Sequence, residues 1–329
     1  MRVAVAGLGA AFIRGHLPAL NRLNQDRSAT LVGLADPDAH RRAAASAELG
    51  ALPIFDCADT MLNTVESDVL IVAADVSSHA QLVVLGAQHR QHVLCEKPLI
   101  ITRDQHELVV RTYGNCQELA LVAVHQYRYS PMWIAVSRWA RRANRLRIPF
   151  TLTVDVERNG LDARAVSQWR ADEETSGGML ADHGVHYLAL GWTISDDVVV
   201  LDARRERHDD ARERAEARVR LGSGVLDLRL SAAAGARHSC ITLGLPAAQV
   251  SWNDEHALLS VGGRTVRRWR TGALSDRRHI DALYLPLYYE MFRNLRDPSW
   301  RARRRAEALV VGGALVELLE RAQSSVGVP

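Results

Sequence analysis

The feature that most constrains the fold is the alternation, over the first 125 residues, of short apolar runs with amphipathic stretches of helical period. Continuous apolar runs, unlike alternating ones, are typical of strands covered on both faces of a parallel sheet. We therefore predict a doubly wound α/β domain. The predicted strands are residues 3–6, 30–35, 69–73, 92–96 and 120–124, and the predicted helices are residues 12–23, 38–49, 79–89 and 103–113.

Beyond Gln126 the pattern changes to segments that alternate apolar and polar residues, which is typical of a sheet with one face open. These segments lie between residues 150 and 270, with Gly-rich turns between several of them. Helices are predicted over residues 131–144, from Ser176 to Ile194, and over residues 283–295 and 303–323. We therefore expect a second α/β domain with a large open mixed or antiparallel sheet.

Composition excludes several classes of protein. The chain has 329 residues, of which 47% are hydrophobic, enough to build the cores of two domains. No apolar run reaches membrane-spanning length, the N-terminus begins a strand and not a signal peptide, and the four cysteines lack the spacing of a disulfide framework or a zinc site. The net charge is only +3, and the arginine clusters at 138–147 and 301–305 are interpreted as solvated helix faces. We expect a cytoplasmic protein that binds neither nucleic acid nor membrane.

A glycine turn follows the first predicted strand. Gly7, Leu8 and Gly9, continued by Ala10 and Ala11, open a helix whose backbone amides can hold a pyrophosphate. The position of the third glycine of the usual fingerprint holds a phenylalanine, and the stretch is one residue longer, so we expect a displaced first helical turn.

Asp36 ends the second predicted strand, where a carboxylate accepts hydrogen bonds from the adenosine ribose and repels a 2′-phosphate. The cofactor is therefore predicted to be NAD. Because Arg41 and Arg42 follow closely, NADP remains the alternative, and an Asp-Pro turn with Pro37 is the non-functional explanation.

Lys97 is the single lysine among 41 basic residues. An arginine is effectively never deprotonated, whereas a lysine amine can shift its pKa and pass a proton. Lys97 follows the strand ending at Glu96 and precedes Pro98, and the carboxyl ends of parallel strands are where open sheets bind ligands. We therefore predict a chemical role for Lys97.

Asp182 and His186 lie four residues apart in a predicted helix, on one face, with Gly184 between them. A carboxylate beside an imidazole commonly orients a general acid or base. A helix cap with a buried core histidine is the alternative. A metal site formed with His183 is disfavoured because adjacent helical residues diverge by about 100°, so no metal is predicted.

Taken together, these motifs resemble the Gfo/Idh/MocA family of nicotinamide-dependent oxidoreductases over essentially the whole chain. The resemblance is carried by the Gly-x-Gly turn, Ser77-Ser78-His79, Glu96-Lys97-Pro98-Leu99, Gln126-Tyr127-Arg128, Trp169-Arg170 and the segment from Gly177 to His186. It implies a dinucleotide-binding Rossmann domain over residues 1–122 and a substrate-binding and oligomerisation domain over residues 123–329. It also implies a homodimer or homotetramer formed through the open sheet.

The resemblance further implies roles for single residues. Lys97 would hydrogen-bond the reacting oxygen, His186 would serve as general acid or base, and Asp182 would position the substrate. Cofactor contacts are expected from Gly7, Leu8, Gly9, Ala10, Ala11, Asp36, Ala74, His79, Glu96 and Lys97, and substrate contacts from Gln126, Arg128, Trp169, Asp182, His183 and His186.

We expect an NAD(P)-dependent enzyme that moves hydride to or from a secondary alcohol or ketone of a sugar, cyclitol or related polyol. The chain departs from the family pattern at Ala74-Asp75, where Thr-Pro is usual, and at Met179, where a glycine is usual. These departures keep open the reduction of an imine or an unusual ketone in a specialised biosynthetic pathway. A non-catalytic, NAD(P)-binding ligand sensor is the third alternative.

Overall fold

A computed structural model describes residues 1–159, 177–209, 212–253, 256–270 and 277–324. The chain divides into two compact units. The first unit comprises Met1–Val124 and Asp281–Leu309, and the second comprises His125–Ile280 and Val310–Pro329.

The first unit contains a parallel sheet of six strands among its described residues. The strand order is β3-β2-β1-β4-β5-β6, and it reverses direction between β1 and β4, as in a doubly wound fold. Every strand of this sheet except the short β3 carries a run of buried apolar side chains. The strands are β1 (Arg2–Ala6), β2 (Thr30–Ala35), β3 (Ile54–Phe55), β4 (Val69–Val72), β5 (His92–Cys95) and β6 (Leu121–Ala123).

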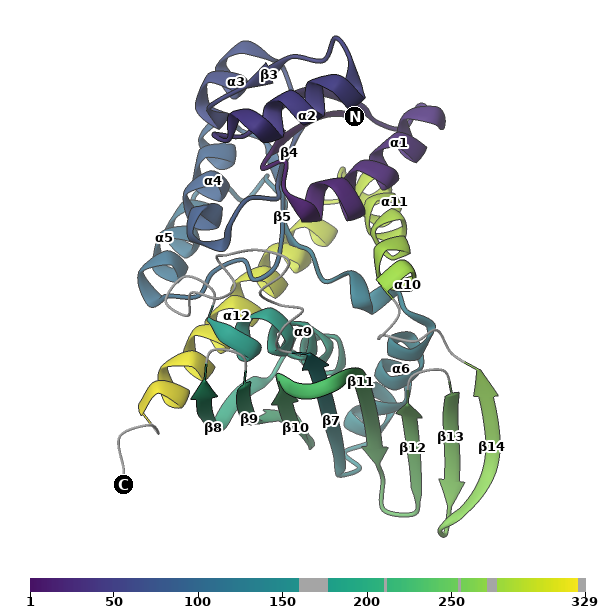
Figure 1. Ribbon diagram of the computed structural model, residues 1–329. Coiled ribbons are helices and arrows are strands. Elements are labelled where there is room, and N and C mark those ends of the chain that lie inside the picture. Colours follow the sequence, from purple (N-terminus) through teal and green to yellow (C-terminus); the bar gives the residue numbers. More distant parts are fainter. Residues whose placement is uncertain (160–176, 210–211, 254–255, 271–276, 325–329) are drawn as a thin grey trace. The chain divides into compact units, whose positions relative to one another are not determined.

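The helices of this unit follow the strands in the predicted alternation (Figure 1). They are α1 (Leu17–Gln25), α2 (Ala39–Leu49), α3 (Ala58–Thr64), α4 (Val76–Gln88) and α5 (Arg103–Gly114), with α11 (Tyr284–Asn294) and the first part of α12 (Pro298–Ser324) from the C-terminal region. The predicted doubly wound fold is confirmed. The short elements β3 and α3 were not predicted.

The extra residue after the glycine turn is accommodated in a π-helical segment, η1 (Phe12–His16), which leads directly into α1. A π-bulge inserts one residue into a helix without ending it. Phe12, which replaces the third glycine, is buried in the core of the unit, so the inserted residue changes the first turn without breaking the helix.

The second unit contains an eight-stranded mixed sheet of order β14-β13-β12-β11-β7-β10-β9-β8, counted over its described residues (Figure 1). Strands β7 and β10 pair in parallel, and the other neighbours pair antiparallel. The strands are β7 (Phe150–Asn159), β8 (Val198–Asp209), β9 (Arg212–Leu221), β10 (Gly224–Ser231), β11 (Ala233–Gly244), β12 (Ala248–Asn253), β13 (His256–Val261) and β14 (Arg264–Arg270). The predicted large open sheet is confirmed.

The helical elements of the second unit carry its predicted site residues. They are η2 (Gln126–Tyr129), α6 (Pro131–Arg145), η4 (Leu180–Gly184) and α9 (Val185–Ile194), while α10 (Arg277–Ala282) lies at the unit boundary. Segment η4 is π-helical and continues into α9, so the predicted helix begins with a wide turn. Among the described helices, none combines the length and the apolar character needed to span a membrane.

Candidate functional site

The glycine turn has the shape that a bound dinucleotide requires. Gly7 adopts φ +98°, and a Cβ there would lie 2.4 Å from the backbone nitrogen of Ala74, so only glycine fits. A Cβ on Gly9 would instead have one neighbour within 4 Å, the Arg41 guanidinium, at an ordinary contact distance of 3.8 Å. The first turn of the following helix also offers N–H groups that lack helical acceptors. The turn therefore fits a pyrophosphate that approaches at Gly9.

Asp36 lies at the carboxyl end of β2 and is almost completely buried. Its Oδ2 accepts a hydrogen bond from the Leu8 amide at 2.7 Å, and its Oδ1 accepts one from the Asp38 amide at 2.9 Å. Arg41 lies 3.6 Å from Oδ2, while Arg42 donates to the Asp36 carbonyl oxygen. Asp36 thus fixes the glycine turn against β2, and Arg41 is the cation beside that turn.

Lys97 is half-buried and lies just after β5. The carboxylate of the preceding residue, Glu96, is held by three groups. Glu96 is 6% exposed, and its Oε2 accepts a hydrogen bond from the Lys97 backbone amide at 3.1 Å. Its Oε1 accepts from the Tyr284 hydroxyl at 2.6 Å and lies 3.1 Å from Nε2 of His16. The other ring nitrogen of His16 contacts the Tyr288 hydroxyl at 2.7 Å. These contacts fix the backbone from which Lys97 extends.

The Glu96 carboxyl stays ionised in this buried cluster. Burial alone would raise its pKa, but the hydrogen bond and charge of His16, the Tyr284 hydroxyl and the nearby Lys97 outweigh burial. Together they lower the pKa of Glu96 from 4.5 to about 2.

His79, a predicted cofactor contact, is buried beside the same strand ends. Its Nδ1 lies 2.7 Å from the Pro98 carbonyl oxygen and its Nε2 lies 3.0 Å from the Ala74 carbonyl oxygen. Burial lowers the pKa of His79, although both carbonyl oxygens favour its protonated form. His79 therefore connects the backbone of Ala74, which packs on Gly7, to the backbone of Pro98, which follows Lys97.

In the second unit, His186 lies at the start of α9 and is 2% exposed. Its imidazole stacks on the ring of Tyr127, with centroids 4.0 Å apart and planes 12° apart, and the His125 ring meets it edge-on. One stacked ring and one edge-on ring together fix the imidazole plane, which a general acid or base requires.

Four other predicted residues of this unit lie on two short helical segments, η2 and η4. Gln126, buried, and Arg128, half-buried, come from η2, and Asp182 and His183 come from η4. Asp182 Oδ2 lies 3.5 Å from Nε2 of His183. Trp169 lies outside the described residues. Over the described part of the chain, no group of three or more His, Cys, Asp or Glu residues is arranged to hold a metal ion.

Sequence reasoning missed three residues of the first unit, namely His16, Tyr284 and Tyr288. A polar His16 within an apolar helix and two tyrosines four residues apart were visible signals. Tyr284 contacts Glu96 across 188 residues of sequence and Tyr288 contacts His16 across 272, which no local pattern reveals.

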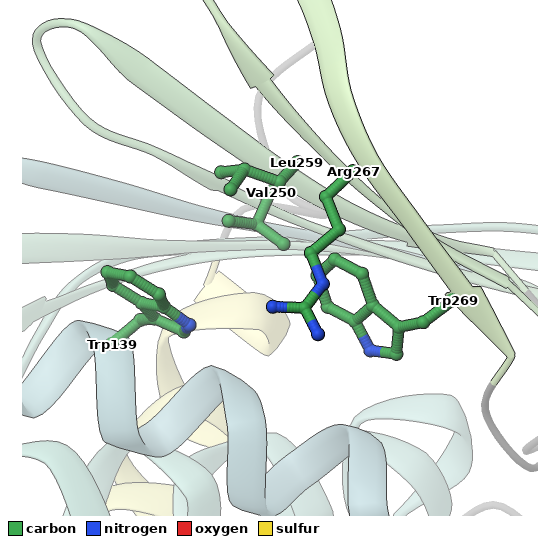
Figure 2. A pocket seen from close by; sticks show the side chains of 5 residues that line it. All are labelled: Trp139, Val250, Leu259, Arg267 and Trp269. Carbon is green, nitrogen blue, oxygen red and sulfur yellow. The ribbon is translucent and has the colours of Figure 1, made fainter.

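A separate hollow of about 270 Å³ lies between α6 and strands β12 to β14 (Figure 2). Its lining residues are Trp139, Val250, Leu259, Arg267 and Trp269. In Figure 2 the Arg267 guanidinium extends between the two indole rings, and Val250 and Leu259 extend toward them from the sheet. None of the predicted site residues lines this hollow.

Comparison with known proteins gives two matches to family models. Residues 1–123 match the model described as an oxidoreductase family, NAD-binding Rossmann fold. Residues 143–245 match the model of the C-terminal alpha/beta domain of the same family, Gfo/Idh/MocA.

Individual relatives agree with these matches. A D-apiose dehydrogenase from Paraburkholderia graminis is 29% identical over 63% of this chain and 53% of that protein. A glucose-6-phosphate 3-dehydrogenase from Bacillus subtilis is 23% identical over 63% of this chain and 57% of that protein. The chain thus matches little more than half the length of these curated relatives.

A solved structure also resembles this chain, namely the WlbA dehydrogenase from Bordetella pertussis in complex with NADH and UDP-GlcNAcA. The match covers 98% of this chain and 97% of that chain, with 21% sequence identity. Its TM-score of 0.76 shows that the two chains share a fold.

Proposed function

Since the chain belongs to the Gfo/Idh/MocA family of oxidoreductases, we propose that it transfers hydride between NAD and a secondary alcohol or ketone of a sugar, a cyclitol or a related polyol. Its N-terminal domain is a NAD-binding Rossmann domain. The observation that carries the proposal is the set of buried contacts that Glu96 makes with His16, Tyr284 and the Lys97 amide. These contacts fix the backbone of Lys97 at the carboxyl end of β5, a central strand of the sheet.

NAD, when bound, supplies the centre that accepts or releases hydride. The Lys97 ammonium hydrogen-bonds the substrate oxygen and stabilises the negative charge that develops there during carbonyl reduction. His186 takes the hydroxyl proton in the oxidative direction and returns it in the reductive direction. Asp182 positions substrate, with His183, Gln126 and Arg128 as neighbouring polar contacts.

The substrate class is supported by the relatives. The two curated relatives described above are named for dehydrogenation of a sugar and of a sugar phosphate. The open sheet also supports a homodimer or homotetramer. Its edge strand β8 exposes Val199 and Leu201, which a second copy of the sheet would cover.

The experiment is a spectrophotometric assay of NAD⁺ reduction with aldoses, cyclitols, polyols and sugar phosphates, together with NADH oxidation by the matching ketones. Turnover with at least one of these compounds is expected. Fluorescence changes of bound NADH without turnover for any compound would instead support a ligand sensor. NADH oxidation with a set of cyclic imines is measured in parallel, and turnover restricted to these imines would support the reductase alternative.

A further inference from the structure

An arginine occupies the end of an apolar row in the second unit. On β7 the side chains that face the core are Leu152, Val154 and Val156, and the next inward position is Arg158, which is 5% exposed. Charged side chains are rarely buried to this extent unless an opposite charge accompanies them.

The acceptors around Arg158 are neutral. Nη1 donates to the carbonyl oxygens of Glu157 and His238 at 2.8 and 2.9 Å. Both Nη1 and Nη2 lie 3.2 Å from the Ser239 hydroxyl. Nε is buried and has no acceptor in the part of the chain that the structure describes. Among the described residues, no carboxylate forms an ion pair with this guanidinium, so its charge is not neutralised by them.

The donors of this cluster outnumber its acceptors. The two Nη1 hydrogens are donated to the two carbonyl oxygens, so the Ser239 hydroxyl is the acceptor that remains for Nη2. The Tyr187 hydroxyl also lies near the Ser239 hydroxyl. The Tyr187 hydroxyl makes no hydrogen bond of normal geometry within the described part of the chain. Nε and Nη2 form the edge of a guanidinium that matches two oxygens of a carboxylate or phosphate. On this edge the Nε–H has no acceptor among the described residues, and Nη2 has only the Ser239 hydroxyl that it shares with Nη1.

The cluster adjoins the proposed acid or base. Tyr187 follows His186 on α9, and its ring stacks on Trp133 at 5.3 Å. Trp133 in turn lies 6.0 Å from Tyr127, the ring on which His186 stacks. Arg158, Tyr187, Trp133 and Tyr127 therefore form one connected cluster around the N-terminal half of α9.

We propose that Arg158 binds an anionic group of the substrate, so that the substrate is a sugar acid or a sugar phosphate and not a neutral polyol. The carboxylate or phosphate oxygens accept hydrogen bonds from Nε and Nη2 and neutralise the buried charge. This inference rests on the proposed function, which it narrows from polyols in general to anionic ones.

The test compares charged and neutral sugars on the full-length protein saturated with NADH. The probes are the uronates and 6-phosphates of glucose, galactose and mannose, each beside its neutral parent sugar, with affinity measured by calorimetry. At least one charged probe is expected to bind roughly tenfold or more tightly than its parent. Uronates and phosphates are separate arms, so the preferred arm identifies the anionic group.

Variants connect the preference to Arg158. Arg158→Gln should remove the preference and leave NADH affinity unchanged, and Arg158→Lys should restore only part of it, because an ammonium lacks the Nε–Nη2 edge. The control is Arg229→Gln, on the same sheet but 61% exposed and paired with Asp155 at 3.5 Å, which should keep the preference. If Arg158→Gln does not fold, thermal unfolding of the wild type serves instead: the preferred charged probe should raise Tm, and its neutral parent at the same concentration should not.

The inference is overturned if no charged probe binds more tightly than its parent, or if Arg158→Gln keeps the preference. If NADH binds and neutral polyols are turned over in that case, the inference about Arg158 is wrong while the proposed function still holds. The proposed function fails instead when NADH does not bind and no compound, charged or neutral, supports NAD⁺ reduction.

Discussion

Replacement of Glu96 by glutamine removes the buried negative charge that connects β5 to His16 and Tyr284. The glutamine side chain has nearly the same shape, so the substitution tests the charge and not the packing. The pKa of Glu96 is about 2 in the folded protein against an ordinary 4.5. At about 1.4 kcal/mol per pH unit, this difference corresponds to roughly 3 kcal/mol of folding free energy.

The sign of the pH dependence follows from the lowered pKa. As the pH falls below 4.5, the unfolded chain takes up a proton at Glu96 while the folded chain does not until the pH approaches about 2. Within this window the unfolded state binds more protons, so the free energy of unfolding falls as the pH falls. Above pH 4.5 the contribution of Glu96 is fully present.

The assay is urea unfolding at a series of pH values from 7 to 3 at constant ionic strength, followed by circular dichroism. Glu96→Gln should be less stable than wild type at pH 7, and the difference should shrink as the pH falls through the window. Glu48→Gln is the matched control, because Glu48 is an exposed residue of α2 in the same unit and should leave the pH profile unchanged. A difference between Glu96→Gln and wild type that is the same at every pH would refute the reasoning.

Three further predictions concern the site. Wild type should bind NADH more tightly than NADPH in fluorescence titrations, and Asp36→Asn should narrow the gap; a wild-type preference for NADPH would show that Arg41, and not Asp36, sets the choice. His186→Gln should lower kcat by roughly 10²-fold while NADH affinity is retained, and unchanged turnover would reduce His186 to a packing residue. Dialysis against EDTA should leave turnover unchanged, since no metal-binding group is found among the described residues; activity lost with a stoichiometric metal and regained on its return would contradict this.

The fold was accessible from the sequence wherever periodicity was strong. Continuous apolar runs such as those of β4 and β5 predict parallel strands, because both faces of such a sheet are covered. By contrast, β3 has two residues, and α3 has seven with no side-chain N-cap, so neither carries enough periodic residues to be recognised. The inserted residue before His16 was visible, but its accommodation as a π-bulge depends on packing of Phe12 in the core.

The candidate site was accessible only in part. Composition singled out Lys97, and motif spacing singled out Asp182 and His186, because these signals are local. The partners of Glu96 come from η1 and α11, and the Tyr127 ring under His186 comes from a different segment. Such contacts arise from tertiary packing, which the local pattern of a single sequence does not encode.

Lys97 has the central role in the proposed reaction, and the substitution Lys97→Arg tests this role. Arginine keeps the charge but replaces a compact ammonium with a larger planar fork that cannot be deprotonated. The measurement is the single-turnover rate of hydride transfer with NAD⁺ and the best substrate, beside NADH affinity for the same variant. We expect unchanged NADH binding and a rate lowered by roughly 10²-fold or more, because about 1 Å of misplacement at the reacting oxygen is enough. A rate close to that of wild type would contradict a direct role of Lys97 at the reacting oxygen.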